Sequence, residues 1–225
     1  FIDGVFNKSL SILGANEKFF VGSLKQGMKE MPDIINAHYG KLADTKQSLV
    51  ALNTAMANEG AFVYVKKGIK LDKLVQILFV NTNHEESRMM QTRNLFVLED
   101  FAEAQIFERH QAFNQGHVFS NSVTESSVGN RAHFKHFKLQ NDLDSSSMVD
   151  STFVKQGANS SALVDTFAFS GELVRNNLHF EFTGMHAEAH MDAITLLKGK
   201  SLVDHHTFVD HAVPNCQSNQ LYKGI

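Results

Sequence analysis

The chain has 225 residues, a formal net charge of −3 and a single cysteine, Cys216. With 43% hydrophobic and 20% charged residues, the composition is typical of an ordered globular protein and excludes a disordered tail. There is no basic excess for nucleic acid and no run of about 20 apolar residues for a membrane span. With one cysteine and no signal-peptide pattern, we expect a cytoplasmic protein.

The first part of the chain, residues 1–59, predicts a mainly helical region after a short initial strand. Residues 2–6 contain an Asp-Gly pair and predict a strand with a tight turn. Ser23 and Gln26 have the spacing of a capping box and predict the start of a first helix. Pro32 forbids continuation of that helix, because proline lacks the backbone N–H that the helix needs.

Two more helices are predicted before the pattern changes. Residues 34–39 predict a second short helix. Asp44 and Gln47 repeat the capping spacing ahead of an apolar face, which predicts a third helix that ends at Gly60.

Beyond Gly60 the hydrophobic period changes from about 3.6 to 2, which predicts β-strands. No helical pattern of the length that a doubly wound α/β sheet needs for its crossovers intervenes. We therefore predict a mainly β domain over residues 60–225. The ranges that read as strands are 61–65, 74–80, 94–98, 162–169, 173–182, 187–197 and 202–211.

Glycines recur in this β region at intervals of about 14 residues, or twice that. They are Gly129, Gly157, Gly171, Gly184 and Gly199. A turn at this interval is typical of successive sides of a wound sheet. A β-sandwich is the alternative, but no Asn-Gly or Asp-Gly hairpin dipeptide follows Gly60, and this favours a parallel β-helix.

Twelve histidines raise the question of a metal site. The densest group of possible ligands runs from Asp204 to Cys216, and His206, His211 and Cys216 are its candidate metal ligands. In a continuous strand His206 and His211 face opposite ways, so a stacked polar ladder is the interpretation that the spacing favours.

Two other histidine groups fit strand surfaces. In residues 185–192 four polar side chains alternate with small or apolar ones, which predicts a solvent-exposed face opposite a core face. His133 and His136 fall on opposite faces of another strand and are predicted to be surface and rim residues. The β region contains no complete nucleotide-binding, hydrolase or zinc-protease motif.

Several short segments together resemble the SufD proteins of the SufB/SufD family, which belongs to the SUF iron–sulfur cluster assembly machinery. These segments follow the family order along nearly the whole chain. They are residues 1–6, 51–55, 59–65, 93–95, 108–110, 121–125, 175–178, 204–207 and 215–225. One departure is Lys66, where the family usually has proline.

The resemblance implies a right-handed parallel β-helix behind the helical N-terminal region. It also implies a non-catalytic scaffold subunit for iron–sulfur cluster assembly, which pairs with a SufB paralogue and works with the ATPase SufC. Under this interpretation no cofactor binds tightly to the chain itself, and the cluster is assembled transiently on the complex.

The chain begins without methionine and stops in a strand-like run, so we expect it to be part of a longer protein. The resemblance would place the SufC-binding helices and an interface histidine beyond Ile225.

The alternative function is a β-helix carbohydrate-active enzyme, either a polysaccharide lyase or a hydrolase. Such an enzyme needs carboxylates in a surface groove. The candidates for that role are Glu188, Asp192, Asp204 and Asp210.

Overall fold

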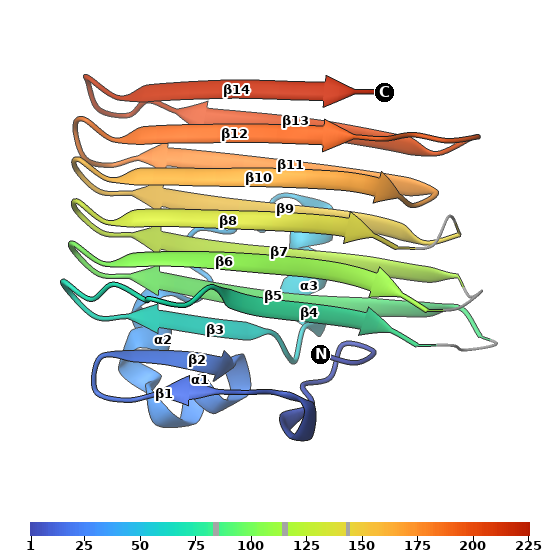
Figure 1. Ribbon diagram of the computed structural model, residues 1–225, viewed down its shortest axis with the longest axis horizontal. Helices are drawn as coiled ribbons and strands as arrows, with labels where there is room; N and C mark the ends of the chain where they lie inside the picture. The colour runs from blue at the N-terminus through green and yellow to red at the C-terminus, as the bar shows by residue number, and fades with distance from the viewer. Residues whose placement is uncertain (83–85, 114–116, 143–144) are drawn as a thin grey trace.

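The computed structural model describes residues 1–82, 86–113, 117–142 and 145–225. It is a mainly β solenoid of about five turns, built from two sheets that lie face to face (Figure 1). The eight-stranded long sheet has the order β1-β2-β3-β5-β7-β9-β11-β13, and the six-stranded short sheet has the order β14-β12-β10-β8-β6-β4. From β3 onward all pairs within each sheet are parallel, so the predicted parallel β-helix is confirmed.

The chain alternates between the two sheets, with one strand of each in every coil. The long sheet contains β1 Gly14–Ala15, β2 Phe19–Ser23, β3 Ala61–Val65, β5 Arg88–Leu98, β7 Val118–Val128, β9 Ser147–Gln156, β11 Leu173–Phe182 and β13 Leu202–Asp210. The short sheet contains β4 Val75–Asn81, β6 Glu103–Ala112, β8 His133–Asn141, β10 Ser161–Ser170, β12 Glu188–Thr195 and β14 Gln217–Gly224. Every strand range predicted beyond Gly60 overlaps one of these strands. The initial strand predicted at residues 2–6 is not formed, and only isolated bridges from Ile2 to Val5 and Val80 flank the turn at Asp3 and Gly4.

The glycine spacing predicted from the sequence corresponds to the corners of the coils. Val128 of β7 pairs with Gln156 of β9, 28 residues later, so one full coil is twice the 14-residue interval. Gly157 and Gly184 follow equivalent strands and stack on each other at one corner. A Cβ added at Gly184 would lie 2.1 Å from the backbone nitrogen of Ala158, so this corner admits no side chain.

Substituting Gly184 by alanine (Gly184→Ala) should therefore lower the free energy of unfolding by about 1–3 kcal/mol, because two backbone segments must move apart. The matched control is Gly224→Ala in β14, where an added Cβ meets no atom within 4 Å. Urea unfolding of both variants measures the difference. Equal unfolding midpoints for the two variants would contradict the proposed crowding at the corner.

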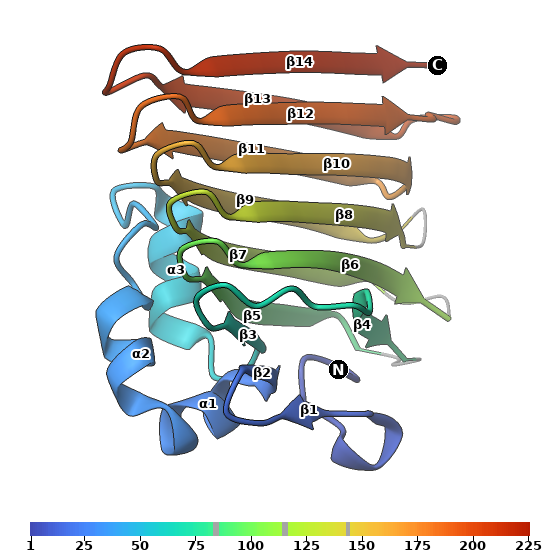
Figure 2. The same cartoon turned by 60° about the vertical axis from the view of Figure 1, so that its left-hand side comes forward.

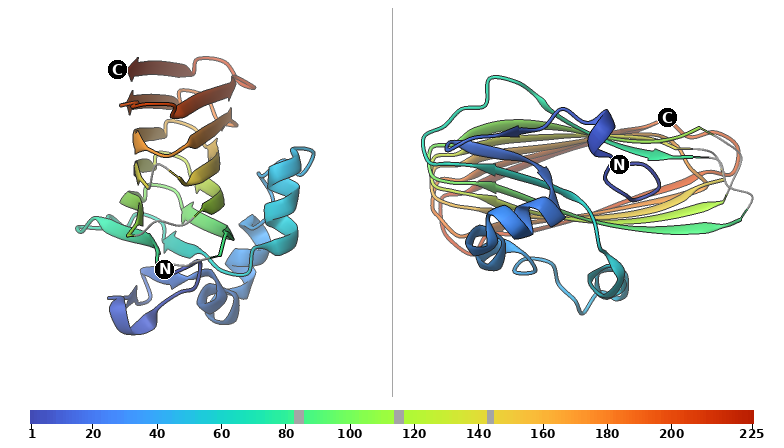
Figure 3. Two further views of the ribbon diagram at one scale, coloured as in Figure 1. Left: turned by 90° about the vertical axis from the view of Figure 1, so that its right-hand side faces the viewer. Right: turned by 90° about the horizontal axis from the view of Figure 1, so that it is seen from below.

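The helical region lies against the outer face of the long sheet, near its N-terminal coils (Figures 2 and 3). The helices are the 3₁₀ helix η1 Lys8–Leu10, α1 Leu24–Glu30, α2 Pro32–His38 and α3 Ser48–Met56. The N-cap predicted at Ser23 is confirmed, since its Oγ accepts a hydrogen bond from the Gln26 N–H at 3.2 Å. Among the described helices, none combines the length and apolar character that a bilayer-spanning helix requires.

The third helix differs from its prediction at both ends. Gln47 occupies the N-cap, and Asp44 accepts a hydrogen bond from the Lys46 N–H in the preceding turn. The helix ends at Met56, before Gly60, and the backbone is already extended at Ala57. At Gly60 the backbone instead passes close to β5. A Cβ on Gly60 would lie 1.7 Å from the carbonyl oxygen of Arg93. The strands β1 and β2 were not predicted, and they extend the long sheet in antiparallel fashion.

Side chains from both sheets fill the space between them. Near the glycine corner this interior is apolar, with fully buried residues such as Phe96, Phe134 and Phe182. Toward the other end of the strands the inward side chains are polar or charged, and many of them are fully buried.

Candidate functional site

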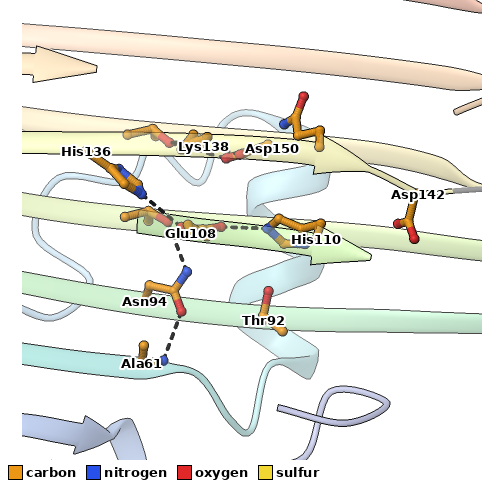
Figure 4. A network of polar contacts seen from close by, with 12 residues as sticks. Ala61, Thr92, Asn94, Glu108, His110, His136, Lys138, Asp142 and Asp150 are labelled. Atoms are coloured by element: carbon orange, nitrogen blue, oxygen red, sulfur yellow. Dashed lines mark hydrogen bonds and ion pairs between the residues drawn. The ribbon is translucent and has the colours of Figure 1, made fainter. Parts of the chain in front are cut away.

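The solenoid interior contains a buried acid–histidine cluster on the short sheet. Alternation along β6 points Glu108 and His110 inward, and alternation along β8 points His136 inward. The Glu108 carboxylate contacts the Nε2 atoms of His110 at 2.6 Å and of His136 at 3.0 Å (Figure 4). Glu108 and His136 are completely buried, and His110 is 4% exposed.

The pKa values of the two histidines shift in opposite directions although both rings contact one carboxylate. Burial alone would raise the pKa of Glu108, but hydrogen bonds from both rings outweigh it and hold the pKa well below its ordinary value. Burial alone would lower the pKa of His110, but Glu108 raises it overall. The pKa of His136 stays lowered by burial. Glu108 therefore stays ionised to lower pH than an ordinary carboxyl, and His110 keeps its proton to higher pH than His136 does.

The tautomer of His136 follows from this arrangement. An ionised carboxylate only accepts hydrogen bonds, so the Nε2 atom of His136 carries the proton that Glu108 accepts. Its Nδ1 is then a bare acceptor, and this buried atom has no hydrogen-bond partner among the described residues. The cluster thus offers one unused acceptor in an enclosed space.

A second buried ion pair crosses the interior from one sheet to the other. The Nζ atom of Lys138 on β8 donates to the Asp150 carboxylate on β9 at 2.7 Å and also to the Thr152 hydroxyl. Lys138 is 4% and Asp150 is 1% exposed. The pair links adjacent coils through the middle of the solenoid.

The polar contacts continue into later coils. Gln140 and Asn176 exchange two amide hydrogen bonds, at 2.7 and 3.0 Å. His205 on β13 contacts Asn176 and lies 2.9 Å from the Thr195 hydroxyl of β12. Together with the two buried ion pairs, these residues form a polar row along the inside of the solenoid.

A third buried ion pair lies outside the solenoid and attaches the helical region. Arg93 on β5 and Glu125 on β7 point toward the helices and pair at 2.7 Å, with 1% and 0% side-chain exposure. The Glu125 carboxylate also accepts backbone N–H groups of Gly40, Leu42 and Ala43 at 2.7–3.1 Å. Burial alone would raise the pKa of Glu125, but Arg93 and these N–H groups hold it below its ordinary value.

The same attachment uses other residues from the segments that carry the family resemblance. Asn53 of α3 donates to the backbone carbonyls of Thr92 and Asn121, both at 2.9 Å. The Arg93 guanidinium lies 5.4 Å from the centre of the Tyr39 ring. Three of the short segments, residues 51–55, 93–95 and 121–125, therefore meet in space although they are far apart in sequence.

The structure does not assemble His206, His211 and Cys216 into one set of ligands. His206 lies on the outer face of β13, where its ring centre is 6.3 Å from that of His179. The ring of His211 packs against Phe182, and its Nε2 contacts the Ser218 hydroxyl at 3.1 Å. The Cys216 thiol donates to the Gly184 carbonyl at 3.4 Å. Within the described ranges, no group of three or more His, Cys, Asp or Glu residues is arranged to hold a metal ion.

The prediction for His136 was wrong. It is a fully buried residue of the polar row, whereas His133 is exposed on the same strand. The sequence does indicate its burial, because residues two apart on a strand share a face and His136 therefore lies on the same face as the buried Phe134. The same signal in β6 places Glu108 and His110 on the face of the buried Ile106.

The predicted two-faced strand in residues 185–192 is confirmed, since His186 and Glu188 are exposed and His190 and Asp192 half-buried, while Ala187, Ala189 and Met191 are fully buried. The four carboxylates of the alternative enzyme do not share a groove. Glu188 and Asp192 lie on the outer face of the short sheet, while Asp204 and Asp210 lie on the outer face of the long sheet. Asp204 is also paired with Arg175.

Comparison with known proteins shows that two stretches of the chain match described protein families. Residues 2–77 match the family described as SufBD protein N-terminal region, and residues 79–225 match SUF system FeS cluster assembly, SufBD core domain.

Three relatives illustrate the similarity. The chain is 26% identical to the iron-sulfur cluster assembly SufBD family protein slr0076 of Synechocystis sp. (strain ATCC 27184 / PCC 6803 / Kazusa), over 84% of this chain and 43% of that protein. It is 26% identical to protein ABCI7, chloroplastic, of Arabidopsis thaliana, over 92% of this chain and 48% of that protein. It is 22% identical to iron-sulfur cluster assembly protein SufD of Escherichia coli (strain K12), over 100% of this chain and 51% of that protein. The chain spans about half the length of these relatives.

Proposed function

Because the chain belongs to the SufBD family of the SUF iron–sulfur cluster assembly system, we propose that it is part of a non-catalytic scaffold subunit. In this role it pairs with a SufB-type paralogue and works with the ATPase SufC. The observation that carries the proposal is the match of both family segments, in order, over residues 2–77 and 79–225.

The geometry of the buried charges supports a scaffold role. Glu108 is held by His110 and His136, Lys138 by Asp150, and Arg93 by Glu125. The Arg93–Glu125 pair joins β5 to β7 and the Lys138–Asp150 pair joins β8 to β9, while Glu108 pairs with His110 within β6 and reaches β8 through the hydrogen bond to His136. Removing one partner of such a pair leaves an uncompensated buried charge. The pairs therefore favour a single alignment of the coils, which is what a rigid platform for partner proteins requires.

The test is co-purification of the full-length protein with its partners. A tagged full-length protein, expressed with SufB and SufC of the same organism, should retain both through purification under reducing, anaerobic conditions. An unrelated tagged β-solenoid protein of similar size is the control. If neither partner exceeds its level in the control, the proposed role is wrong.

We further propose that the cluster is assembled transiently on the complex and that this chain holds no tightly bound cofactor. Iron and acid-labile sulfide would be measured in the separately purified subunit and in the complex. The proposal predicts substoichiometric iron in the subunit, unchanged by substitution of His206, His211 and Cys216. Stoichiometric iron that is lost on these substitutions would contradict it.

A further inference from the structure

The helical region packs on the first coils of the long sheet and leaves part of its outer face to other contacts. The helices α1 and α3 pack mainly on β2, β3, β5 and β7. In Figure 2 the helices lie beside the lower coils, and β13 lies above them. Parallel sheets are normally covered on both faces, so the outer face of the later strands is a place where another protein can pack.

A groove lies at the boundary between the helical region and these later strands. Its volume is about 360 Å³, and it is bordered by the segment before α3 and by β9, β11 and β13. Ligand sites in proteins have volumes of about 300–1,000 Å³. The wall on the helical side consists of Leu42, Asp44 and Gln47. The Gln47 amide lies 3.5 Å from the Nε2 atom of His179, so the wall contacts the floor.

The floor of the groove contains a row of aromatic side chains. The strand register aligns Phe153, His179 and Phe208 on neighbouring strands. The rings of Phe153 and His179 stack with their centres 4.8 Å apart, and the centre of the Phe208 ring is 5.9 Å from that of His179. The row adds little positive charge at neutral pH, because burial lowers the pKa of His179 and the nearby His206 lowers it further. The floor is therefore largely apolar, and Phe208 is 54% exposed within it.

The groove carries more negative than positive charge. The next row along the strands is Lys155, Glu181 and Asp210, which are all exposed. Asp44 on the opposite wall brings the lining to three carboxylates and one ammonium group. Among the residues that the structure describes, none of the three carboxylates forms an ion pair. The groove therefore complements a cation that also has an apolar part.

An arginine side chain has both of these properties. Glu181 and Asp210 lie in register on adjacent strands, which are about 4.8 Å apart, so one guanidinium group can reach both carboxylates. The guanidinium group has five N–H donors in a planar fork that suits carboxylates, whereas the lysine ammonium group is a compact and strongly hydrated charge. The methylene stem of an arginine can cover the apolar floor while its charged end pairs with the carboxylates.

We propose that this groove binds an arginine side chain on a segment of a partner protein. The guanidinium group lies between the carboxylates of Glu181 and Asp210, and the stem packs against the Phe208 ring. The contact lies on the outer face of the long sheet beside the helical region. It does not depend on the proposed pairing with a SufB-type paralogue, and either can exist without the other.

Methyl NMR of the full-length protein tests the occupant. The probe is the peptide acetyl-Gly-Gly-Arg-Gly-Gly-amide, and its control has citrulline, which is neutral and nearly the same shape, in place of arginine. The arginine peptide should shift the methyl signals of Leu42 with an association constant at least about tenfold higher than that of the citrulline peptide. The methyl signals of Ile194, on the outer face of the short sheet, should not move. Equal affinity for the two peptides, or no shift at Leu42, would overturn the proposal.

Neutral variants test the two carboxylates. Glu181→Gln together with Asp210→Asn should lower the association constant of the arginine peptide at least about tenfold, because the guanidinium group loses both anions. The control with the same net charge is Glu172→Gln together with Glu188→Gln, since both residues are exposed and lie outside the groove. An equal loss in the two double variants would show that only the overall charge of the protein attracts the peptide, and the assigned site would be wrong.

The aromatic floor is tested separately. Phe208→Ala should weaken binding of the arginine peptide by about threefold, because the stem loses apolar contact. Leu221→Ala is the matched control, since Leu221 is 55% exposed on the outer face of the short sheet, and it should leave binding unchanged. Circular dichroism of every variant checks that the solenoid is retained. Equal affinities for the two variants would contradict the placement of the stem on Phe208.

Discussion

Replacing Glu125 by alanine (Glu125→Ala) is expected to lower the free energy of unfolding by about 3–5 kcal/mol, because it leaves the buried Arg93 without its anion. It also removes the acceptor for the backbone N–H groups of Gly40, Leu42 and Ala43. Urea unfolding of the full-length protein measures the loss. Limited proteolysis should show faster cleavage between α2 and α3, where these N–H groups lie.

The matched control for this prediction is an ion pair exposed to solvent. Glu103 pairs with Lys70 at 2.8 Å, with side-chain exposures of 40% and 66%. Removing such a pair changes stability by roughly 0–1 kcal/mol. If Glu125→Ala were no more destabilising than Glu103→Ala, the buried pair would not be what attaches the helical region.

Replacing Glu108 by glutamine (Glu108→Gln) is expected to lower the free energy of unfolding by about 2–3 kcal/mol near pH 6, because a charged hydrogen bond inside the solenoid is lost. Glu108 raises the pKa of folded His110 above its ordinary value of about 6.5. The stabilisation from His110 is therefore fully present below about pH 6.5 and is lost as the pH rises through the folded pKa. The difference in stability between wild type and variant should therefore shrink at alkaline pH.

The stabilisation from Glu108 depends on pH in the opposite direction to that from His110. The pKa of Glu108 is lowered in the folded protein, so its contribution is present above its ordinary value of about 4.3. That contribution is lost as the pH falls through the folded pKa. Urea unfolding at about pH 6 and about pH 9 measures the first effect. His133→Gln is the control, because His133 is exposed, and a pH profile shared by both variants would contradict the role of the Glu108–His110 pair.

Local patterns predicted much of the fold. The alternation in Ala61–Val65 and Leu173–Phe182 matches β3 and β11, and the Ser23 cap matches the start of α1. The third helix was predicted less well, because Asp44 has the spacing of a cap but makes its hydrogen bond within a turn. Gly60 does not end this helix, which stops at Met56, but permits the close approach of the backbone to β5.

The candidate site was much less accessible to prediction. Alternation assigns His136 to one face of its strand but does not say that this face is enclosed. Polar residues on a strand are exposed by default, and the interpretation of His136 as a rim residue followed that default. The second sheet encloses this face, so the default exposure of polar residues does not hold there. Glu108 on a neighbouring strand and Asp150 across the interior supply partners for the buried polar groups.

Periodicity along the chain is a local property, and it was enough to establish strands, turns and the length of a coil. Which buried polar groups meet depends on residues about 30 positions apart that stacking brings to adjacent strands, as with Arg93 and Glu125 or Glu108 and His136. No local pattern encodes those pairings, since they exist only after the coils have stacked in register. The polar row and the attachment of the helices are therefore products of the folded solenoid.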